Sequence, residues 1–244
     1  MRAWLRTSWL FIACICITPY SSAQSQPSSY AVSVRELSIP PKAARAFQQG
    51  MERLAKKDAA GSLPHFQRAI LEFASYYEAY DRMGAADLKL WRIPDAEEAF
   101  RKSIDLSGSH YAHPLLALGS ILDSQEKFAE AESVTLKGLE LDPESWTGHY
   151  YLALALFGLN RLEEAEKSVQ ESLRGKPDFA EAHLLLARIH SRDQDYSAAV
   201  SDLDEYLELA PDGPASAKAK ALREFTQRML SGIRGNAALG QSQP

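Results

Sequence analysis

Histidines are the side chains in this chain whose type and spacing could support metal chemistry. His110 and His113 lie three apart, and His149 and His183 occupy equivalent places in a repeating pattern, so two pairs of imidazole nitrogens are available as ligands. A metal centre needs three or four protein ligands, and cysteine or carboxylate groups usually complete the set. Both cysteines fall near the N-terminus, and no carboxylate completes either pair at a recognisable spacing. We therefore predict no metal site.

Acidic pairs are the second set of residues whose type and spacing could support catalysis. They are Glu97 with Glu98, Glu163 with Glu164, and Asp202 with Asp204. These pairs fall at the expected starts of helices or on exposed helix faces, where acidic groups interact favourably with the helix dipole. The chain contains no glycine-rich phosphate loop, no serine-centred nucleophile elbow and no zinc-protease helix motif. The sequence therefore predicts a protein that is not an enzyme and that holds no cofactor.

Residues 1–23 have the features of an export signal. Arg2 and Arg6 precede an apolar run over residues 9–17, and small residues that a signal peptidase reads end at Ala23. The run is shorter than the roughly 20 apolar residues that a membrane span needs. We predict cleavage after Ala23 and an exported protein, periplasmic or secreted, with no integral membrane span in the mature chain.

A second interpretation of this leader remains open. Cys14 and the two residues before it resemble part of a lipoprotein cleavage signal, in which Cys14 is acylated and tethers the protein to a membrane. Cleavage after Ala23 instead removes both Cys14 and Cys16 and leaves a mature chain without thiols, which suits an oxidising compartment. Residues 24–41, rich in serine, glutamine and proline, are predicted to form a linker.

The charge of the mature chain restricts its partners. Without Arg2 and Arg6, it carries 25 basic and 32 acidic residues. Nucleic acids and anionic membrane surfaces both require a basic face on the proteins that bind them. We therefore expect no nucleic-acid partner.

A fixed repeat interval organises the second half of the chain. The residues that recur at this interval are Pro143, Pro177 and Pro211 and, in parallel, Ala131, Ala165 and Ala199. A period of about 34 residues is typical of stacked helical hairpins, each too small to bury its own apolar face. Because proline cannot continue a helix, each proline marks the end of one unit.

Small residues recur on both expected helices of each unit. On the first helix they are Gly50, Gly84, Gly119, Ala153 and Ala187. On the second helix they are Ser62, Ala96, Ala131, Ala165 and Ala199, each followed four positions later by Phe66, Phe100, Thr135, Val169 or Leu203. Paired helices approach closely only where one side chain is small, so we expect the helices to cross there. The interval from Gly84 to Gly119 is one position longer than the others, which predicts a register shift near residues 108–112.

This pattern of small, aromatic and proline positions resembles the tetratricopeptide repeat family. The resemblance implies an all-α fold, a right-handed α-solenoid of about five helix-turn-helix repeats. The repeats are expected at residues 43–76, 77–110, 112–145, 146–179 and 180–213. An amphipathic capping helix is expected at 214–231, and a disordered tail at 232–244. The combination of an export leader with these repeats resembles the exported bacterial members of the family.

In this family the first helices of successive repeats line a concave groove, and the resemblance implies that positions two, five, nine and twelve of each unit point into it. The partner-binding candidates are Phe47, Met51, Asp81, His113, Leu116, Tyr150, Leu154, Phe157, Leu184 and Arg188. Leu116, Tyr150 and Phe157 are the leading candidates, because a buried anchor can contribute about 2 kcal/mol or more to binding. The alternative is that these side chains pack within the stack itself.

The expected function is a scaffold that binds a protein or peptide partner in this groove and assembles or retains a complex in the cell envelope. Two alternatives remain. The chain could be a structural subunit that associates with copies of itself as a homo-oligomer, or a membrane-tethered lipoprotein adaptor if Cys14 is acylated.

Overall fold

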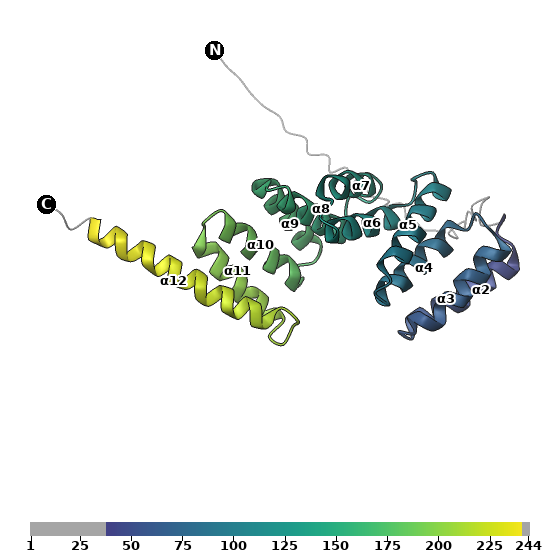
Figure 1. The fold of residues 1–244 in the computed structure, drawn as a ribbon, viewed down its shortest axis with the longest axis horizontal. Helices are drawn as coiled ribbons and strands as arrows, with labels where there is room; N and C mark the ends of the chain where they lie inside the picture. The colour runs from purple at the N-terminus through teal and green to yellow at the C-terminus, as the bar shows by residue number, and fades with distance from the viewer. Residues whose placement is uncertain (1–37, 241–244) are drawn as a thin grey trace, which may run out of the picture. The chain divides into compact units, whose positions relative to one another are not determined.

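Eleven helices and no strand make up residues 38–240, the part of the chain that the computed structural model describes (Figure 1). The helices are α2 Pro41–Ala55, α3 Ala59–Glu72, α4 Tyr77–Lys89, α5 Ile93–Ser107, α6 Ala112–Ser124, α7 Phe128–Leu141, α8 Trp146–Gly158, α9 Leu162–Gly175, α10 Ala180–Arg192, α11 Tyr196–Leu209 and α12 Ser216–Gly240. The predicted leader, including Cys14, and most of the predicted linker lie outside the described residues.

The helices pack as five hairpins followed by a single helix. Helix α2 pairs with α3, α4 with α5, α6 with α7, α8 with α9, and α10 with α11, while α12 packs on α11. Each hairpin also contacts the next one through its second helix, as α3 does with α4 and α7 with α8. The described part of the chain is therefore an all-α repeat solenoid, which confirms the fold class predicted from the sequence.

The two helices of each hairpin cross at the small residues that the sequence marks. In the first hairpin, a Cβ atom added to Gly50 would lie 2.6 Å from the ring of Phe66. The corresponding pairs in the other hairpins are Gly84 with Phe100, Gly119 with Thr135, Ala153 with Val169 and Ala187 with Leu203. The larger member of every pair is fully buried. A small residue at this place is therefore what allows the helices to approach.

The turn inside each hairpin contains one residue in the left-handed backbone region. These residues are Lys57, Trp91, Glu126, Asn160 and Gln194, with φ between 59° and 65°. Asparagine adopts this conformation readily, whereas the other four residue types pay about 1 kcal/mol or more for it. The packing of the two helices outweighs this local preference, and for that reason no glycine marks these turns in the sequence.

The connection between α5 and α6 differs from the other connections between hairpins. Gly108 and Ser109, with φ of 62° and 61°, are both left-handed. Helices α7 and α9 instead end in residues with negative φ, −136° at Asp142 and −146° at Lys176. The left-handed ending accommodates the extra residue of the longer repeat interval. It confirms the register shift predicted near residues 108–112.

Apolar clusters join successive hairpins. One cluster combines Phe157 of α8, Val169 of α9 and Ile189 of α10. A second cluster combines Phe100 of α5 with Leu118 of α6 and further residues of α6, α7 and α8. Each hairpin thus covers the apolar side of its neighbour, as a repeat too small to form its own core requires.

The last helix is longer than the sequence predicted. Helix α12 packs on α11 through Ala219 and Leu222 and continues to Gly240, whereas we expected a cap over 214–231 and a disordered tail over 232–244. Glycine and asparagine lower helix propensity without ending a helix, and the next proline is Pro244. Residues 241–244 lie outside the described part. None of the described helices, α12 included, has the length and apolar composition that crossing a membrane requires.

We predict that Gly50→Ala destabilises the protein by about 1 to 3 kcal/mol, because the added methyl group overlaps the buried ring of Phe66. Combining Gly50→Ala with Phe66→Leu should recover part of this loss, since Ala187 and Leu203 already form the same pair in the last hairpin. Denaturant unfolding of the wild type, both single variants and the double variant measures the coupling. Additive losses in the double variant would contradict the steric explanation.

Candidate functional site

The first helices of the hairpins form a continuous row. Helix α2 contacts α4, α4 contacts α6, α6 contacts α8, and α8 contacts α10. All ten predicted partner-binding residues come from these five helices. We call the part of these helices that the second helices leave uncovered the first-helix face.

Exposure separates the ten predicted residues into three groups. His113 and Arg188 are exposed; Phe47, Met51, Tyr150, Leu154 and Leu184 are half-buried; Asp81, Leu116 and Phe157 are buried. Leu116 packs so closely against Gly138 of α7 and Gly148 of α8 that a Cβ on either glycine would collide with it. Its side chain therefore serves mainly the stack, and little of it is open to a partner.

Asp81 is a fully buried carboxylate that joins α4 to the start of α6. The Tyr111 hydroxyl donates a hydrogen bond to it over 3.1 Å, and Nδ1 of His113 lies 2.6 Å from its other oxygen. Burial, reinforced by the charge of Asp81, raises the pKa of Tyr111, so the hydroxyl keeps its proton. Arg82 completes the group, with Nε 3.5 Å from Asp81. This network fixes the orientation of the exposed His113 ring.

Tyr150 belongs to an aromatic cluster between α8 and α10. Its ring meets Phe179 edge-on with the centroids 4.8 Å apart, and Phe179 meets Trp146 in the same way at 4.9 Å. Burial, followed by the nearby charge of Glu181, raises the pKa of Tyr150 to about 12. The half-buried side chain therefore presents a neutral hydroxyl on a ring that its neighbours hold in place.

A cavity of about 330 Å³ lies beside Phe157 and draws residues from α6, α8 and α10. The guanidinium groups of Arg188 and Arg192 lie over the Phe157 ring, 4.6 and 4.0 Å from its centroid. Such contacts orient a guanidinium. Arg192 also donates from Nη1 to the Phe157 carbonyl over 3.1 Å, which fixes its position further. Burial raises the pKa of Asp123 at the same cavity, and the positive charge of Arg188 opposes that shift. The cavity thus combines an aromatic wall with hydrogen-bond donors and an acceptor.

The histidines considered as metal ligands make other hydrogen bonds. Nε2 of His149 donates to the carbonyl of Pro143 over 2.9 Å, and Nε2 of His183 donates to that of Pro177 over 3.2 Å. Each histidine thus ties a first helix to the proline that closes the preceding repeat. Across the described residues, no group of three or more histidine, cysteine, aspartate or glutamate side chains is arranged to hold a metal ion.

Sequence reasoning missed three residues on or beside this face. Tyr111 and Arg82 complete the Asp81 network, but Tyr111 stands in the connection where the register shifts, outside the mapped helix positions. Arg192 falls beyond the last mapped position of α10. Its spacing of one helical turn from Arg188 was the available signal, because residues four apart share a helix face.

Comparison with known proteins identifies the repeat. A family model for the tetratricopeptide repeat matches residues 116–178 and again residues 152–214. Residues 116–214 therefore match the tetratricopeptide repeat. The tetratricopeptide repeat and J domain-containing co-chaperone DNJ1 of Cryptococcus neoformans is 30% identical over 104 residues, which cover 43% of this chain and 19% of that protein. The chain spans about a fifth or less of the curated relatives that it matches.

Solved tetratricopeptide repeat structures share this fold. PilW, a widely conserved type IV pilus biogenesis factor, superimposes with a TM-score of 0.65 at 17% identity, covering 82% of this chain and 95% of PilW. YrrB, a tetratricopeptide repeat protein with an unusual peptide-binding site, superimposes with a TM-score of 0.58 at 18% identity, covering 73% of this chain and 92% of YrrB. These similarities establish the architecture.

We predict that Tyr111→Phe lowers the free energy of unfolding by about 1.5 to 3 kcal/mol, because the buried Asp81 carboxylate loses a hydrogen-bond donor. Tyr80→Phe is the matched control, since the half-buried Tyr80 hydroxyl has no hydrogen-bond partner among the described residues. Urea unfolding monitored by circular dichroism measures both variants. Equal losses in the two variants would rule out a special role for the Tyr111 hydroxyl.

Proposed function

We propose that the protein is a non-catalytic scaffold that binds a protein or peptide partner on the first-helix face. The observation that carries this proposal is the distribution of half-buried apolar side chains along the row. Phe47 and Met51 lie on α2, Tyr150 and Leu154 on α8, and Leu184 on α10. Side chains of this kind keep accessible apolar surface while their neighbours restrict their motion, which is what a recognition anchor needs.

Pre-organisation is the mechanism that we propose for binding. The Tyr150 ring is held by Phe179, and Arg188 and Arg192 are held against Phe157, so these groups lose little conformational entropy when a partner docks. A partner segment would then bury its apolar side chains against Tyr150 and Leu154. Its polar groups would meet the guanidinium groups beside Phe157.

We further propose that this scaffold works in the cell envelope, where it assembles or retains a complex. The export features of residues 1–23 support this location. The fold shared with PilW, a type IV pilus biogenesis factor, is in keeping with it.

The double variant Tyr150→Ala, Leu154→Ala should lose at least tenfold in affinity for the partner, because two apolar anchors are removed from the face. The wild-type protein, immobilised as bait, is exposed to an envelope fraction, and mass spectrometry identifies the captured proteins. Calorimetry then measures the affinity of the wild type and of each variant for the captured partner. Leu136→Ala on α7, a second helix, is the control, since this leucine is 42% exposed but lies off the first-helix face. Unchanged affinity in the folded double variant would refute the proposed face.

Self-association is a second candidate function, favoured by the surface of α12. Phe225 and Met229 are 52% and 39% exposed there, one helical turn apart. Light scattering after size-exclusion chromatography separates the two candidates, because a monomer at micromolar concentration would eliminate self-assembly as the main role.

A further inference from the structure

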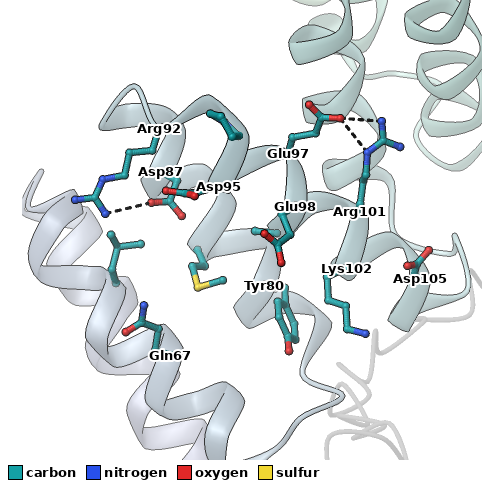
Figure 2. A pocket seen from close by; sticks show the side chains of 14 residues that line it. Gln67, Tyr80, Asp87, Arg92, Asp95, Glu97, Glu98, Arg101, Lys102 and Asp105 are labelled. Atoms are coloured by element: carbon teal, nitrogen blue, oxygen red, sulfur yellow. Dashed lines mark hydrogen bonds and ion pairs between the residues drawn. The ribbon is translucent and has the colours of Figure 1, made fainter.

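A second, larger cavity lies away from the first-helix face. Its volume is about 830 Å³, and residues of α3, α4 and α5 line it (Figure 2). Helix α4 contributes Tyr80, Met83 and Asp87, which share one side of that helix by their spacing. Asp81 belongs to a different side of α4, so this α3–α5 pocket is separate from the surface discussed above.

A buried carboxylate without a hydrogen bond stands in the wall of the pocket. The Asp87 side chain is 7% exposed, and its carboxylate accepts no hydrogen bond from the described residues. Its nearest cation is Nη1 of Arg92 at 3.8 Å, too far for a hydrogen bond, on a side chain that is 54% exposed. Burial raises the pKa of Asp87, the charge of Asp95 raises it further, and Arg92 opposes both. The enclosed side-chain atoms that lack a hydrogen-bond partner among the described residues do not include the Asp87 oxygens, so the carboxylate faces the cavity and not the packed core.

The repeat pattern gives this position to the apolar core in the third and fourth hairpins, whereas the first hairpin has the exposed Arg53 there. Counted by the repeat interval, Asp87 corresponds to Leu122 and Leu156, which are 1% and 3% exposed. The fold therefore does not need a carboxylate at this place. Burying one is unfavourable unless a cation or hydrogen-bond donors accompany it.

The last hairpin indicates which partner such a charge requires. His190 occupies the equivalent position, with Nδ1 2.6 Å from Asp202 and Nε2 3.6 Å from Glu166. By the same count, Leu63 stands in place of Glu166 and Ala99 in place of Asp202, and both line the α3–α5 pocket. Two acids thus face the half-buried His190 in the last hairpin, whereas the equivalent positions beside Asp87 are uncharged and Arg92, at 3.8 Å, is its nearest cation.

We propose that the α3–α5 pocket binds a lysine or arginine side chain of a partner protein, with the alkyl stem against the half-buried Tyr80 and Met83 and the charged end at Asp87. The lining favours a cation, since its acids Asp87, Asp95, Glu97, Glu98 and Asp105 outnumber its bases Arg92, Arg101 and Lys102. Arg101 does not offset the other acids, because it is paired with Glu97 at 2.8 Å (Figure 2).

The walls of the pocket favour a side chain over a small inorganic cation. Tyr80 and Met83 offer apolar surface that an alkyl stem can bury, as long basic side chains do when their charged ends find a partner. A bare metal ion would instead need several ligand groups around one point. The described residues contain no such group of histidine, cysteine, aspartate and glutamate side chains.

The test uses two capped pentapeptides that differ only at the central residue, lysine in one and uncharged norleucine in the other, each flanked by leucine. Titrations are followed by backbone amide shifts of the isotope-labelled protein. The lysine peptide should bind at least tenfold more tightly than the norleucine peptide and shift amides around Asp87 and Glu98. Asp87→Leu should abolish this preference, and Asp212→Asn, an exposed acid outside the pocket, should leave it unchanged.

Two further results bear on the proposal. Arg92→Gln removes the internal cation that competes for Asp87, so lysine-peptide affinity should rise severalfold. Asp87→Leu is expected to fold, because Leu122 and Leu156 are native at this position. Equal binding of both peptides, or a lysine preference that survives Asp87→Leu, would overturn the proposal. A shift of the same amides by calcium with no response to the lysine peptide would overturn it as well.

Stability provides an independent prediction for Asp87. Burial raises its folded-state pKa above the unfolded value of about 3.9, so its ionisation at neutral pH lowers stability and its protonation in acid restores it. Asp87→Asn should therefore melt about 2 to 4 °C above the wild type at pH 7. The two proteins should converge as the pH falls towards about 4. The charged groups acting on Asp87 are Asp95 and Arg92, and α3 adds neutral Leu63 and Gln67. Identical melting temperatures at pH 7 would contradict an unfavourable charge.

Discussion

The close crossing of two helices inside each hairpin is the constraint on which the rest of the structure depends. Where the first helix carries glycine, the second presents phenylalanine or threonine, and where the first carries alanine, the second presents valine or leucine. The size of one residue compensates for the other, so all five hairpins keep a similar separation with different side chains. Similar hairpins can then stack by one repeated contact.

That regularity produces the surface on which we propose that a partner binds. Because each hairpin places its first helix against the first helix of the next, side chains from five helices share one face. Buried residues of the stack hold the polar groups on this face in place. The Asp81 carboxylate orients His113, and the Phe157 ring orients Arg188 and Arg192. Contacts that stabilise the repeat thus also restrict the motion of the exposed groups on this face.

The sequence predicted the repeated elements better than the individual site. The repeat interval identified the crossing residues, and all five small residues of the second helices are buried as expected. Helix α12 extended further than predicted, because weak helix formers do not stop a helix that has already begun. The Asp81 network could not be predicted from periodicity, since Tyr111 lies in an irregular connection. The burial of Asp87 could not be predicted from the sequence either, because an acidic residue on a helix is usually solvated. Its burial follows from packing with α3 and α5.

The α3–α5 pocket and the cavity beside Phe157 share no residue, and they draw on different helices of the stack. In an array where hairpins contact mainly their neighbours, filling one of these sites need not rearrange the other. A single polypeptide with a segment for each would be held at two points, and once the first segment docks, the second is present at an effective concentration of about millimolar. Two individually weak contacts would then sustain a long-lived complex. Cutting the tether between the segments would make that complex dissociate.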